Sequence, residues 1–394
     1  MPNARELQPL EVPPGTGALD VLPELRRALD GDGPALLPVP AGEPTAAAGL
    51  AGPLAPPEDD PADPTALVIA TSGSTGAAKG VLLPASALRA SAAATHRRLG
   101  GPGTWLLAMP AHHVAGVQVL VRALLAGTEP HAVDITGGFR PEGFTAAAGA
   151  ALAAPGRHYT ALVPTQLSRL LEAGGPALTA LAGFDAVLLG GAATPPALLQ
   201  RARAAGVRVT TTYGMSETSG GCVYDGVPLD IAEVRIDAED DTGPILLAGP
   251  MRARGYRHRP DAAEFDGRWF RTGDLGRMRD DRLEVLGRAD DVIISGGVNI
   301  APLPVERVLT EQPGVRESCV LGVEDPEWGQ VVVAAVVPDP AEPPRPEDLR
   351  AAVRERLGPA ATPKRVEFLA ELPLRGPGKP DRRGLAERFG GRST

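Results

Sequence analysis

The sequence contains few cysteines and no long apolar run. Cys222 and Cys319 are its only cysteines, too few for a disulfide framework or, on their own, for a zinc site. No stretch approaches the roughly eighteen consecutive apolar residues of a membrane-spanning helix, so we predict no membrane span. The start, MPNARELQPLEVPPG, lacks the basic region and apolar core of an export signal, and we therefore predict a reducing cytoplasm as the location.

The sequence also lacks any block of basic residues. Lysine and arginine together number 39 against 48 aspartates and glutamates, which gives a net charge of −9 at pH 7. We therefore expect neither a nucleic-acid partner nor a membrane partner. With 43% hydrophobic and 22% charged residues, the 394-residue chain has the composition of a globular protein, and its length predicts two or three domains.

Lysine is scarce, because only Lys79, Lys364 and Lys379 accompany 36 arginines. A coding bias toward Ala, Arg, Gly and Pro explains the imbalance, since arginine then serves wherever a generic surface cation is needed. A compact ammonium and a planar guanidinium are not interchangeable at a specific site. The three lysines are therefore candidates for a specific task.

Short apolar runs alternate with Ala- and Leu-rich stretches from Ala66 onward, which predicts strands and helices in turn and hence a mostly parallel sheet. The predicted strands are 66–70, 105–109, 159–163, 186–189 and 207–211. The predicted helices are 86–99, 114–125, 165–172 and 195–205. Before them we predict a helix near 18–29, followed over 31–64 by an irregular connection with at most one short strand, at 35–39.

Strands shorten and helices disappear after about Val223, which predicts a small β-rich subdomain over 224–289. A separate α+β unit is predicted over 291–394. Its expected helices are 304–310, 346–357 and a short one after Asp381, and its expected strands are 315–323 and 331–337. The predicted class is thus α/β, with a large N-terminal domain over 1–289 and a small C-terminal domain.

The segment Thr71–Gly80, TSGSTGAAKG, directly follows a predicted strand. Its backbone amides can converge on an anion, and its hydroxyls and the Lys79 ammonium add further donors, which suits a polyphosphate. It is not a Walker A loop, because the spacing GxxxxGK[ST] is not met. Taken alone, a Gly/Ser-rich surface turn stays open as the alternative.

Four further segments carry groups that suit a nucleotide. In TTYGMSETSGG, Tyr213 offers a flat face to a nucleobase and Glu217 offers a carboxylate to a phosphate-bound Mg²⁺. In FRTGDLGRM, Asp274 can accept hydrogen bonds from two ribose hydroxyls. The other two segments are GRADDVIISGGVNIAP at 287–302 and LPLRGPGKPDRRGL at 372–385. Singly, a buried tyrosine or a capping aspartate is the better explanation.

Together and in this order, the segments resemble those of the adenylate-forming superfamily, which comprises acyl-CoA synthetases, the adenylation domains of peptide synthetases and luciferases. Three more segments agree with this resemblance: MPAHHVAG at 109–116, LLGGAATPP at 188–196 and GPILLAGPMRARGY at 243–256. The resemblance covers about Ala66 to the C-terminus. It implies a mobile C-terminal domain that rotates about a hinge at Asp290 between two half-reactions. Typical members place the phosphate segment much later, so residues 1–64 would be a shortened variable region.

The resemblance implies a role for each segment. The ATP phosphates would be held by Thr71, Ser72, Gly73, Ser74, Thr75, Gly76 and Lys79. Adenine would lie against Tyr213, Gly214 and Met215, beside Gly190, Gly191 and Ala192. Glu217 would bind Mg²⁺, Asp274 and Arg288 would hold the ribose, and Gly296 and Gly297 would line the CoA channel. Lys379 would bridge the substrate carboxylate and the α-phosphate, a task that suits a mobile point charge.

Within the superfamily, the sequence resembles most closely the o-succinylbenzoate–CoA ligases of menaquinone biosynthesis, in their short actinobacterial form. The paired His112 and His113, VPTQLSRLL at 163–171 and YGMSETSGGCVYDGVPL at 213–229 carry this resemblance. It implies a ligase that uses ATP, Mg²⁺ and coenzyme A to make an acyl-adenylate and then a thioester of an aromatic carboxylic acid. The acid would contact His113, Thr165, Ser219, Gly220 and Gly221, with His113 also a candidate catalytic residue. A homodimer stays open.

Several alternatives stay open. Another aryl- or acyl-CoA ligase, or a stand-alone adenylation enzyme that loads a carrier protein, would use the same segments. A non-catalytic nucleotide-binding module is disfavoured by the intact Lys379 and Glu217, and a carboxylate kinase would release ADP instead of AMP. Two departures from the superfamily pattern, Ala78 in place of a common proline and Pro380 after the lysine, remove no functional group.

Overall fold

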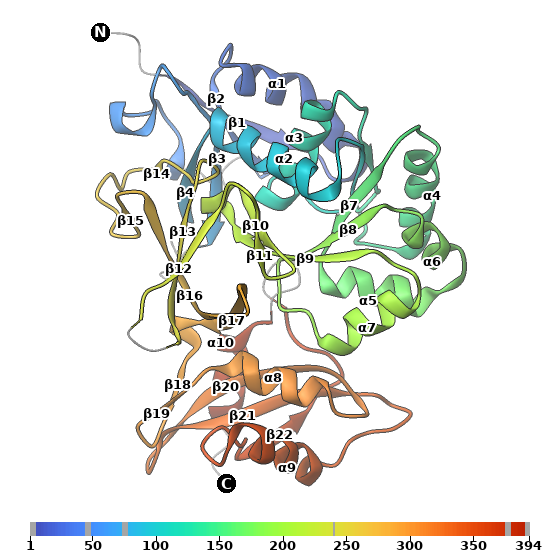
Figure 1. The fold of residues 1–394 in the computed structure, drawn as a ribbon, viewed down its shortest axis with the longest axis vertical. Coiled ribbons are helices and arrows are strands. Elements are labelled where there is room, and N and C mark those ends of the chain that lie inside the picture. The colour runs from blue at the N-terminus through green and yellow to red at the C-terminus, as the bar shows by residue number, and fades with distance from the viewer. Residues whose placement is uncertain (1–4, 44–48, 73–77, 239–240, 375–379, 391–394) are drawn as a thin grey trace. The chain divides into compact units, whose positions relative to one another are not determined.

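The computed structural model describes residues 5–43, 49–72, 78–238, 241–374 and 380–390 (Figure 1). The chain divides into two compact units. The first covers residues 1–190, 202–235 and 246–271, and the second covers 191–201, 236–245 and 272–394. The hinge at Asp290 and the domain boundaries beside it stay a prediction.

The first unit contains a five-stranded sheet of order β1-β2-β3-β4-β14. Its strands are β1 (Leu7–Val12), β2 (Ala35–Pro40), β3 (Thr65–Ser72), β4 (Ala78–Pro84) and β14 (Gly255–Tyr256). The first three are parallel, whereas β4 runs antiparallel to β3 and β14 antiparallel to β4. Within the described part of 31–64 the structure has the one expected strand, β2, whereas β1 was not predicted: it contains Pro9, and its buried positions do not alternate.

The second sheet of this unit has seven strands in the order β11-β10-β9-β8-β7-β5-β6. The strands are β5 (Thr104–Leu107), β6 (His131–Ala132), β7 (His158–Leu162), β8 (Ala186–Leu189), β9 (Val209–Met215), β10 (Gly220–Tyr224) and β11 (Val227–Pro228). From β6 to β9 all pairings are parallel, and β10 and β11 are added antiparallel at one edge. The mostly parallel α/β sheet predicted from the sequence is confirmed.

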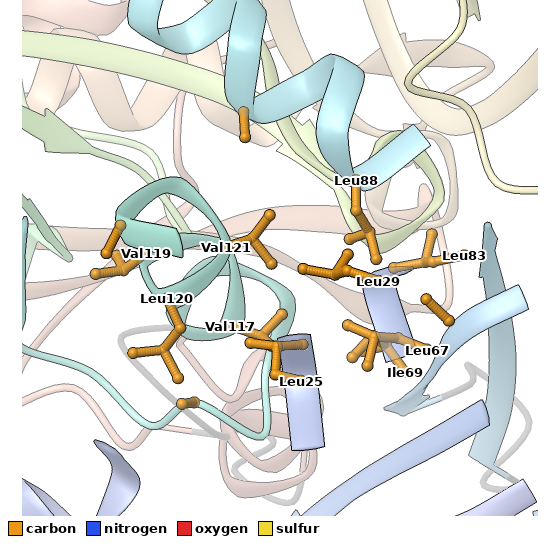
Figure 2. Packing of buried hydrophobic residues seen from close by; sticks show 14 of the residues in the cluster. Leu25, Leu29, Leu67, Ile69, Leu83, Leu88, Val117, Val119, Leu120 and Val121 are labelled. Atoms are coloured by element: carbon orange, nitrogen blue, oxygen red, sulfur yellow. The ribbon is translucent and has the colours of Figure 1, made fainter. Parts of the chain in front are cut away.

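Three helices join these two sheets. The helices up to residue 204 are α1 (Leu22–Asp30), α2 (Ala85–Leu99), α3 (Val114–Ala126), α4 (Pro141–Leu152), α5 (Pro164–Ala173), α6 (Gly175–Ala182) and α7 (Pro196–Ala204), with short 3₁₀ turns η1 (Gly15–Val21) and η3 (Pro56–Glu58). Figure 2 shows Leu29 of α1, Leu88 of α2 and Val117 of α3 packed beside Leu67 and Ile69 of β3. Each such side chain contributes about 1.5–3 kcal/mol on burial. α2 contacts strands of both sheets, whereas α1 contacts strands of the first sheet and α3 strands of the second. Because the three helices also contact one another, they form a shared apolar layer.

A third sheet has the order β12-β13-β16-β15, with β17 paired to β16. Its strands are β12 (Glu233–Ile236), β13 (Gly243–Ala248), β15 (Phe265–Asp266), β16 (Trp269–Arg279) and β17 (Arg282–Arg288). The boundary between the units passes through β12, β13 and β16.

The C-terminal part of the second unit is the predicted α+β arrangement. Its sheet has the order β19-β18-β21-β20, with β22 beside β21. The strands are β18 (Ile293–Ser295), β19 (Val298–Ile300), β20 (Val315–Asp325), β21 (Gly329–Pro338) and β22 (Arg365–Phe368), and the helices are α8 (Pro302–Thr310), α9 (Pro346–Leu357) and α10 (Arg382–Gly390). Side chains alternate along β20: Val320 packs with α8 and α9, whereas Cys319 and Leu321 pack with α10.

A buried ion pair closes the edge of the first sheet. Arg257 and Glu58 are each only 4% exposed. The Glu58 carboxylate accepts hydrogen bonds from the Arg257 guanidinium and from the amides of Ala55 and His258, at 2.8 and 2.7 Å. The guanidinium also donates to four carbonyl oxygens of residues 50–53, at 3.0–3.4 Å. Burial alone would raise the pKa of Glu58, but these donors outweigh it and lower the pKa.

Removing one member of this pair should destabilise the first unit. Arg257→Ala leaves the buried Glu58 carboxylate without its opposite charge and several carbonyls without a donor, so we expect a loss of about 3–5 kcal/mol in the free energy of unfolding. The control is Arg27→Ala, whose exposed pair with Glu24 should contribute less than about 1 kcal/mol. Urea unfolding followed by circular dichroism measures both, and equal stability of the two variants would contradict the role given to Arg257.

Candidate functional site

The predicted phosphate segment joins two antiparallel strands of the first sheet. Thr71 near the end of β3 lies directly opposite Lys79 of β4, and the Thr71 hydroxyl donates to the Lys79 carbonyl at 3.4 Å. The segment was expected to be a loop as far as Gly80, whereas Ala78 already begins β4. Gly73, Ser74, Thr75 and Gly76 lie outside the described residues.

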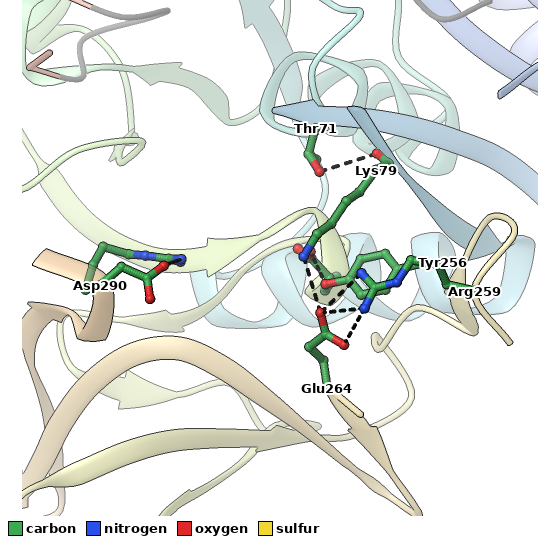
Figure 3. A network of polar contacts seen from close by, with 8 residues as sticks. Thr71, Lys79, Tyr256, Arg259, Glu264 and Asp290 are labelled. Carbon is green, nitrogen blue, oxygen red and sulfur yellow. Dashed lines mark hydrogen bonds and ion pairs between the residues drawn. The ribbon is translucent and has the colours of Figure 1, made fainter. Parts of the chain in front are cut away.

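Lys79 belongs to a compact group of charged and aromatic side chains (Figure 3). Its ammonium lies 3.2 Å from Glu264 Oε1 and 5.1 Å from the centroid of the Tyr256 ring. Arg259 lies 5.2 Å from the same ring centroid and 3.2 Å from Glu264 Oε2. The two cations therefore share one aromatic ring and one carboxylate, and the side chain of Lys79 stays 30% exposed.

Glu217 joins this group through a hydrogen bond. The Tyr256 hydroxyl donates to Glu217 Oε1 at 2.8 Å, and Tyr256 itself is 3% exposed. Burial, reinforced by the neighbouring Glu217 carboxylate, raises the pKa of Tyr256, so the hydroxyl stays protonated as a donor. The second oxygen of Glu217 makes no hydrogen bond or ion pair with the described part of the chain. Glu217 lies in the 3₁₀ turn η4 (Ser216–Thr218), directly after β9.

The predicted adenine segments lie at the ends of neighbouring parallel strands. Gly190 follows β8, and Tyr213, Gly214 and Met215 belong to β9, which extends four residues beyond the predicted strand. Gly191 and Ala192 follow Gly190 directly in the chain. Because β8 and β9 are parallel, their carboxyl ends meet at one edge of the sheet, where open α/β sheets bind ligands.

Gly214 allows a close contact at this edge. It pairs with Gly221 of β10, and a Cβ atom on Gly214 would lie 2.1 Å from the carbonyl oxygen of Gly220. No larger residue fits there without displacing β10.

The residues predicted to contact the acid lie in three elements. His113 is the N-cap of α3, with its ring centroid 4.2 Å from that of His112, and Thr165 lies in the first turn of α5. Ser219 is fully buried, and its hydroxyl donates to the Met251 carbonyl at 2.9 Å. Gly220 and Gly221 begin β10. Whether these residues contact the acid stays a prediction.

A cavity of about 230 Å³ lies on the His112 side of this histidine pair. Its lining is mostly apolar, with Val12, Ala18, Leu107 and Val133 beside His112. Burial, with a further effect of His113, lowers the pKa of His112 to about 4, so the His112 imidazole is neutral at pH 7.

In the second unit, Asp274 and Arg288 face each other across the β16–β17 hairpin. Arg288 Nη1 lies 3.5 Å from Asp274 Oδ1, and Arg288 Nη2 lies 3.4 Å from Asp290 Oδ2. Asp290 lies in the 3₁₀ turn η5 (Ala289–Asp291). Gly296 and Gly297 form the turn between β18 and β19, both with positive φ. Lys379 lies outside the described residues, whereas Lys364 lies over the Trp328 ring at 4.8 Å.

Comparison with known proteins matches both parts of the chain. The family model of AMP-binding enzymes matches residues 16–257, and that of the AMP-binding enzyme C-terminal domain matches residues 304–379. The chain belongs to the AMP-binding enzyme family. This membership confirms the adenylate-forming fold, and within it Lys79, Tyr213 and Glu217 are placed by one unit and Asp274 and Arg288 by the other.

Relatives and solved structures within this family narrow the comparison. A probable 2-succinylbenzoate–CoA ligase of Mycobacterium tuberculosis is 46% identical over 392 residues, which covers 98% of this chain and 99% of that protein. The o-succinylbenzoate CoA synthetase (MenE) of Bacillus subtilis, solved with the acyl-adenylate OSB-AMP, is 31% identical with a TM-score of 0.70, covering 82% of this chain and 69% of that one. The amide bond synthetase McbA of Marinactinospora thermotolerans is 28% identical with a TM-score of 0.78, covering 99% and 90%.

Sequence reasoning missed Tyr256, Arg259 and Glu264. Tyr256 ends the segment GPILLAGPMRARGY, and its place in that segment was the available signal. Glu264 lies in none of the segments recognised in the sequence. Its contact with Lys79, 185 residues earlier in the chain, is therefore visible only in the structure.

The contact at Gly214 yields a prediction on stability. We expect Gly214→Ala to lower the free energy of unfolding by about 1–3 kcal/mol, because the added methyl overlaps the Gly220 carbonyl. Gly149→Ala is the control: a Cβ on this exposed glycine of α4 meets nothing within 4 Å, and alanine should stabilise the helix by up to about 1 kcal/mol. Urea unfolding of both variants measures the difference, and an unchanged Gly214→Ala protein would refute the steric argument.

Proposed function

We propose that this chain is an AMP-forming o-succinylbenzoate–CoA ligase of menaquinone biosynthesis. It converts o-succinylbenzoate, ATP and coenzyme A into o-succinylbenzoyl-CoA, AMP and pyrophosphate through an acyl-adenylate. The observation that carries the proposal is the full-length similarity to the mycobacterial ligase, at 46% identity. The solved Bacillus subtilis relative with OSB-AMP supports the same intermediate.

The chemical task is to make a carboxylate reactive. A carboxylate is a poor electrophile and repels the anionic triphosphate, so the enzyme must align the two groups and stabilise the charge that develops. Adenylation turns the carboxylate into a mixed anhydride with AMP, and the thiol of coenzyme A then attacks the acyl carbon as AMP leaves. Positioned cations and amides are the groups that this reaction needs.

The first unit supplies such groups for the phosphates. Lys79 presents a part-exposed ammonium beside the predicted phosphate segment, and Thr71 stands opposite it at the base of the same hairpin. Tyr213, at the carboxyl end of β9, presents its ring to adenine. In the second unit, Asp274 accepts hydrogen bonds from the ribose hydroxyls and Arg288 fixes its carboxylate.

Glu217 fits a magnesium site. Within the described ranges no group of three or more His, Cys, Asp or Glu side chains could hold a metal ion. Mg²⁺ typically uses one or two carboxylates together with substrate phosphates, and the second oxygen of Glu217 meets this need. When bound, Mg²⁺ neutralises charge on the triphosphate and so favours departure of pyrophosphate.

Further parts of the proposal concern the acid, the C-terminal unit and the assembly. His113 and Thr165 contact the acid near the start of α3 and α5, together with Ser219, Gly220 and Gly221. Rotation of the C-terminal domain about Asp290 brings Lys379 to ATP for the first half-reaction. In the second half-reaction, Gly296 and Gly297 line the CoA channel instead. The protein acts in the cytoplasm, alone or as a homodimer. No helix in the described ranges is long and apolar enough to span a bilayer.

The direct test is product analysis with purified protein. We expect o-succinylbenzoate, MgATP and coenzyme A to yield the thioester and AMP in equal amounts, measured by liquid chromatography with mass spectrometry. AMP without a thioester would indicate another acceptor, such as a carrier protein or an amine. ADP would indicate a carboxylate kinase. Pyrophosphate exchange with other acids only would identify a different ligase.

Lys379 should separate adenylation from nucleotide binding. The Lys379 ammonium acts on charge that develops in the transition state. We therefore expect Lys379→Ala to slow pyrophosphate exchange roughly 10³-fold, which corresponds to an activation free energy higher by several kcal/mol, while ATP binding changes little. Lys364→Ala is the matched control, since the Lys364 ammonium lies over the Trp328 ring and Lys364 is not among the proposed site residues. Pyrophosphate exchange and equilibrium ATP binding measure the two effects, and an active Lys379→Ala enzyme would exclude this mechanism.

A further inference from the structure

We propose that Tyr256 is a positioning residue that holds Glu217 in the orientation needed to bind the metal of MgATP. The inference rests on the proposed function only in taking Glu217 as the metal ligand. Tyr256 itself touches neither metal nor nucleotide in this proposal, and it acts through the carboxylate.

The hydrogen bond from Tyr256 gives the two oxygens of the Glu217 carboxylate different roles. The Tyr256 hydroxyl donates to Oε1 at 2.8 Å, which leaves Oε2 without a hydrogen bond in the described part of the chain. A glutamate fixed at one oxygen presents the other in one direction. Without that bond, the carboxylate of the half-buried Glu217 can rotate about its terminal torsions and meets a metal in fewer of its conformations.

The tyrosine ring is itself held on several sides. Phe265 packs edge-on against it, with the two ring centroids 5.2 Å apart and the planes at 78°. Lys79 and Arg259 lie near the ring, at 5.1 and 5.2 Å from its centroid, and Glu264 binds both cations. Figure 3 shows this arrangement of Lys79, Tyr256, Arg259 and Glu264. The ring therefore forms a rigid support for its hydroxyl.

The backbone around Tyr256 is equally constrained. Tyr256 pairs with Val81 of β4, and the next residue, Arg257, donates its amide to the Gly80 carbonyl at 2.7 Å. The buried pair of Arg257 with Glu58 then fixes this strand against the N-terminal segment. Tyr256 thus connects the strand that carries Lys79 to the turn that carries Glu217.

A competing role for the hydroxyl predicts the opposite result. If the hydroxyl competed with the metal for the carboxylate, removing it would tighten metal binding. A role in packing alone would leave metal binding unchanged, because phenylalanine keeps the ring and its contacts with Phe265.

The test measures Mn²⁺ binding to the complex with a non-hydrolysable α,β-methylene analogue of ATP, by electron paramagnetic resonance. We expect Tyr256→Phe to weaken Mn²⁺ binding roughly 10-fold, as is typical when a partner of a metal ligand is lost. Binding of the analogue without metal should not change. The control is Tyr159→Phe, which removes a tyrosine hydroxyl that donates to the carbonyls of Leu99 and Gly101 instead.

A double-mutant cycle identifies the route of the effect. In a Glu217→Gln background, Tyr256→Phe should add less than about a 2-fold further loss, because the two residues act as one unit. Unchanged or tighter Mn²⁺ binding in Tyr256→Phe, or full additivity with Glu217→Gln, would overturn the proposal. Neither acid nor coenzyme A is present, so an incorrect substrate assignment leaves this measurement unaffected.

Discussion

The nucleotide-binding half of the first unit depends on one buried guanidinium. Arg257 binds Glu58 and the carbonyls of residues 50–53 through its side chain, and Gly80 through its amide. It therefore joins the N-terminal segment, the hairpin of the phosphate segment and strand β14, which are separated by up to about two hundred residues in the sequence. An arginine suits this position, because its planar fork satisfies several acceptors at once, which a single ammonium does not.

The contacts of Arg257 also fix the positions of the charged and aromatic side chains beside it. β14 places Tyr256 next to Arg257, and β4 places Lys79 next to Gly80, so one constraint sets both the ring and the ammonium that lies over it. Glu264 pairs with both Lys79 and Arg259 and so reduces the repulsion between them, and Glu217 supplies the second negative charge of the group. A group this close to neutral costs little to keep assembled before a nucleotide arrives, and the site is thereby preorganised.

The chemistry-bearing segments could be predicted from the sequence, whereas their contacts could not. Gly- and Ser-rich turns, a lone lysine and the order of the segments are local signals, and from them Lys79, Glu217 and Asp274 were predicted as site residues. Tyr256 and Glu264 matter because of their contacts with Glu217 and Lys79, which lie 39 and 185 residues away in the sequence. Local periodicity also missed β1, because a strand parallel to β2 gains its stability from a neighbour twenty-eight residues further along the chain.

Each unit holds its own share of the proposed nucleotide-binding residues by internal contacts. In the first, the β3–β4 hairpin and the Tyr256–Glu217 hydrogen bond hold the residues proposed to bind the phosphates and the metal. In the second, the register of β16 and β17 sets Asp274 against Arg288. The proposed domain rotation between half-reactions would require this division, because a residue positioned only by contacts with the other unit would lose its geometry at each rotation. A unit that holds its binding residues by internal contacts would keep their geometry during such a rotation, which is the physical condition for the proposed use of one C-terminal unit in two reactions.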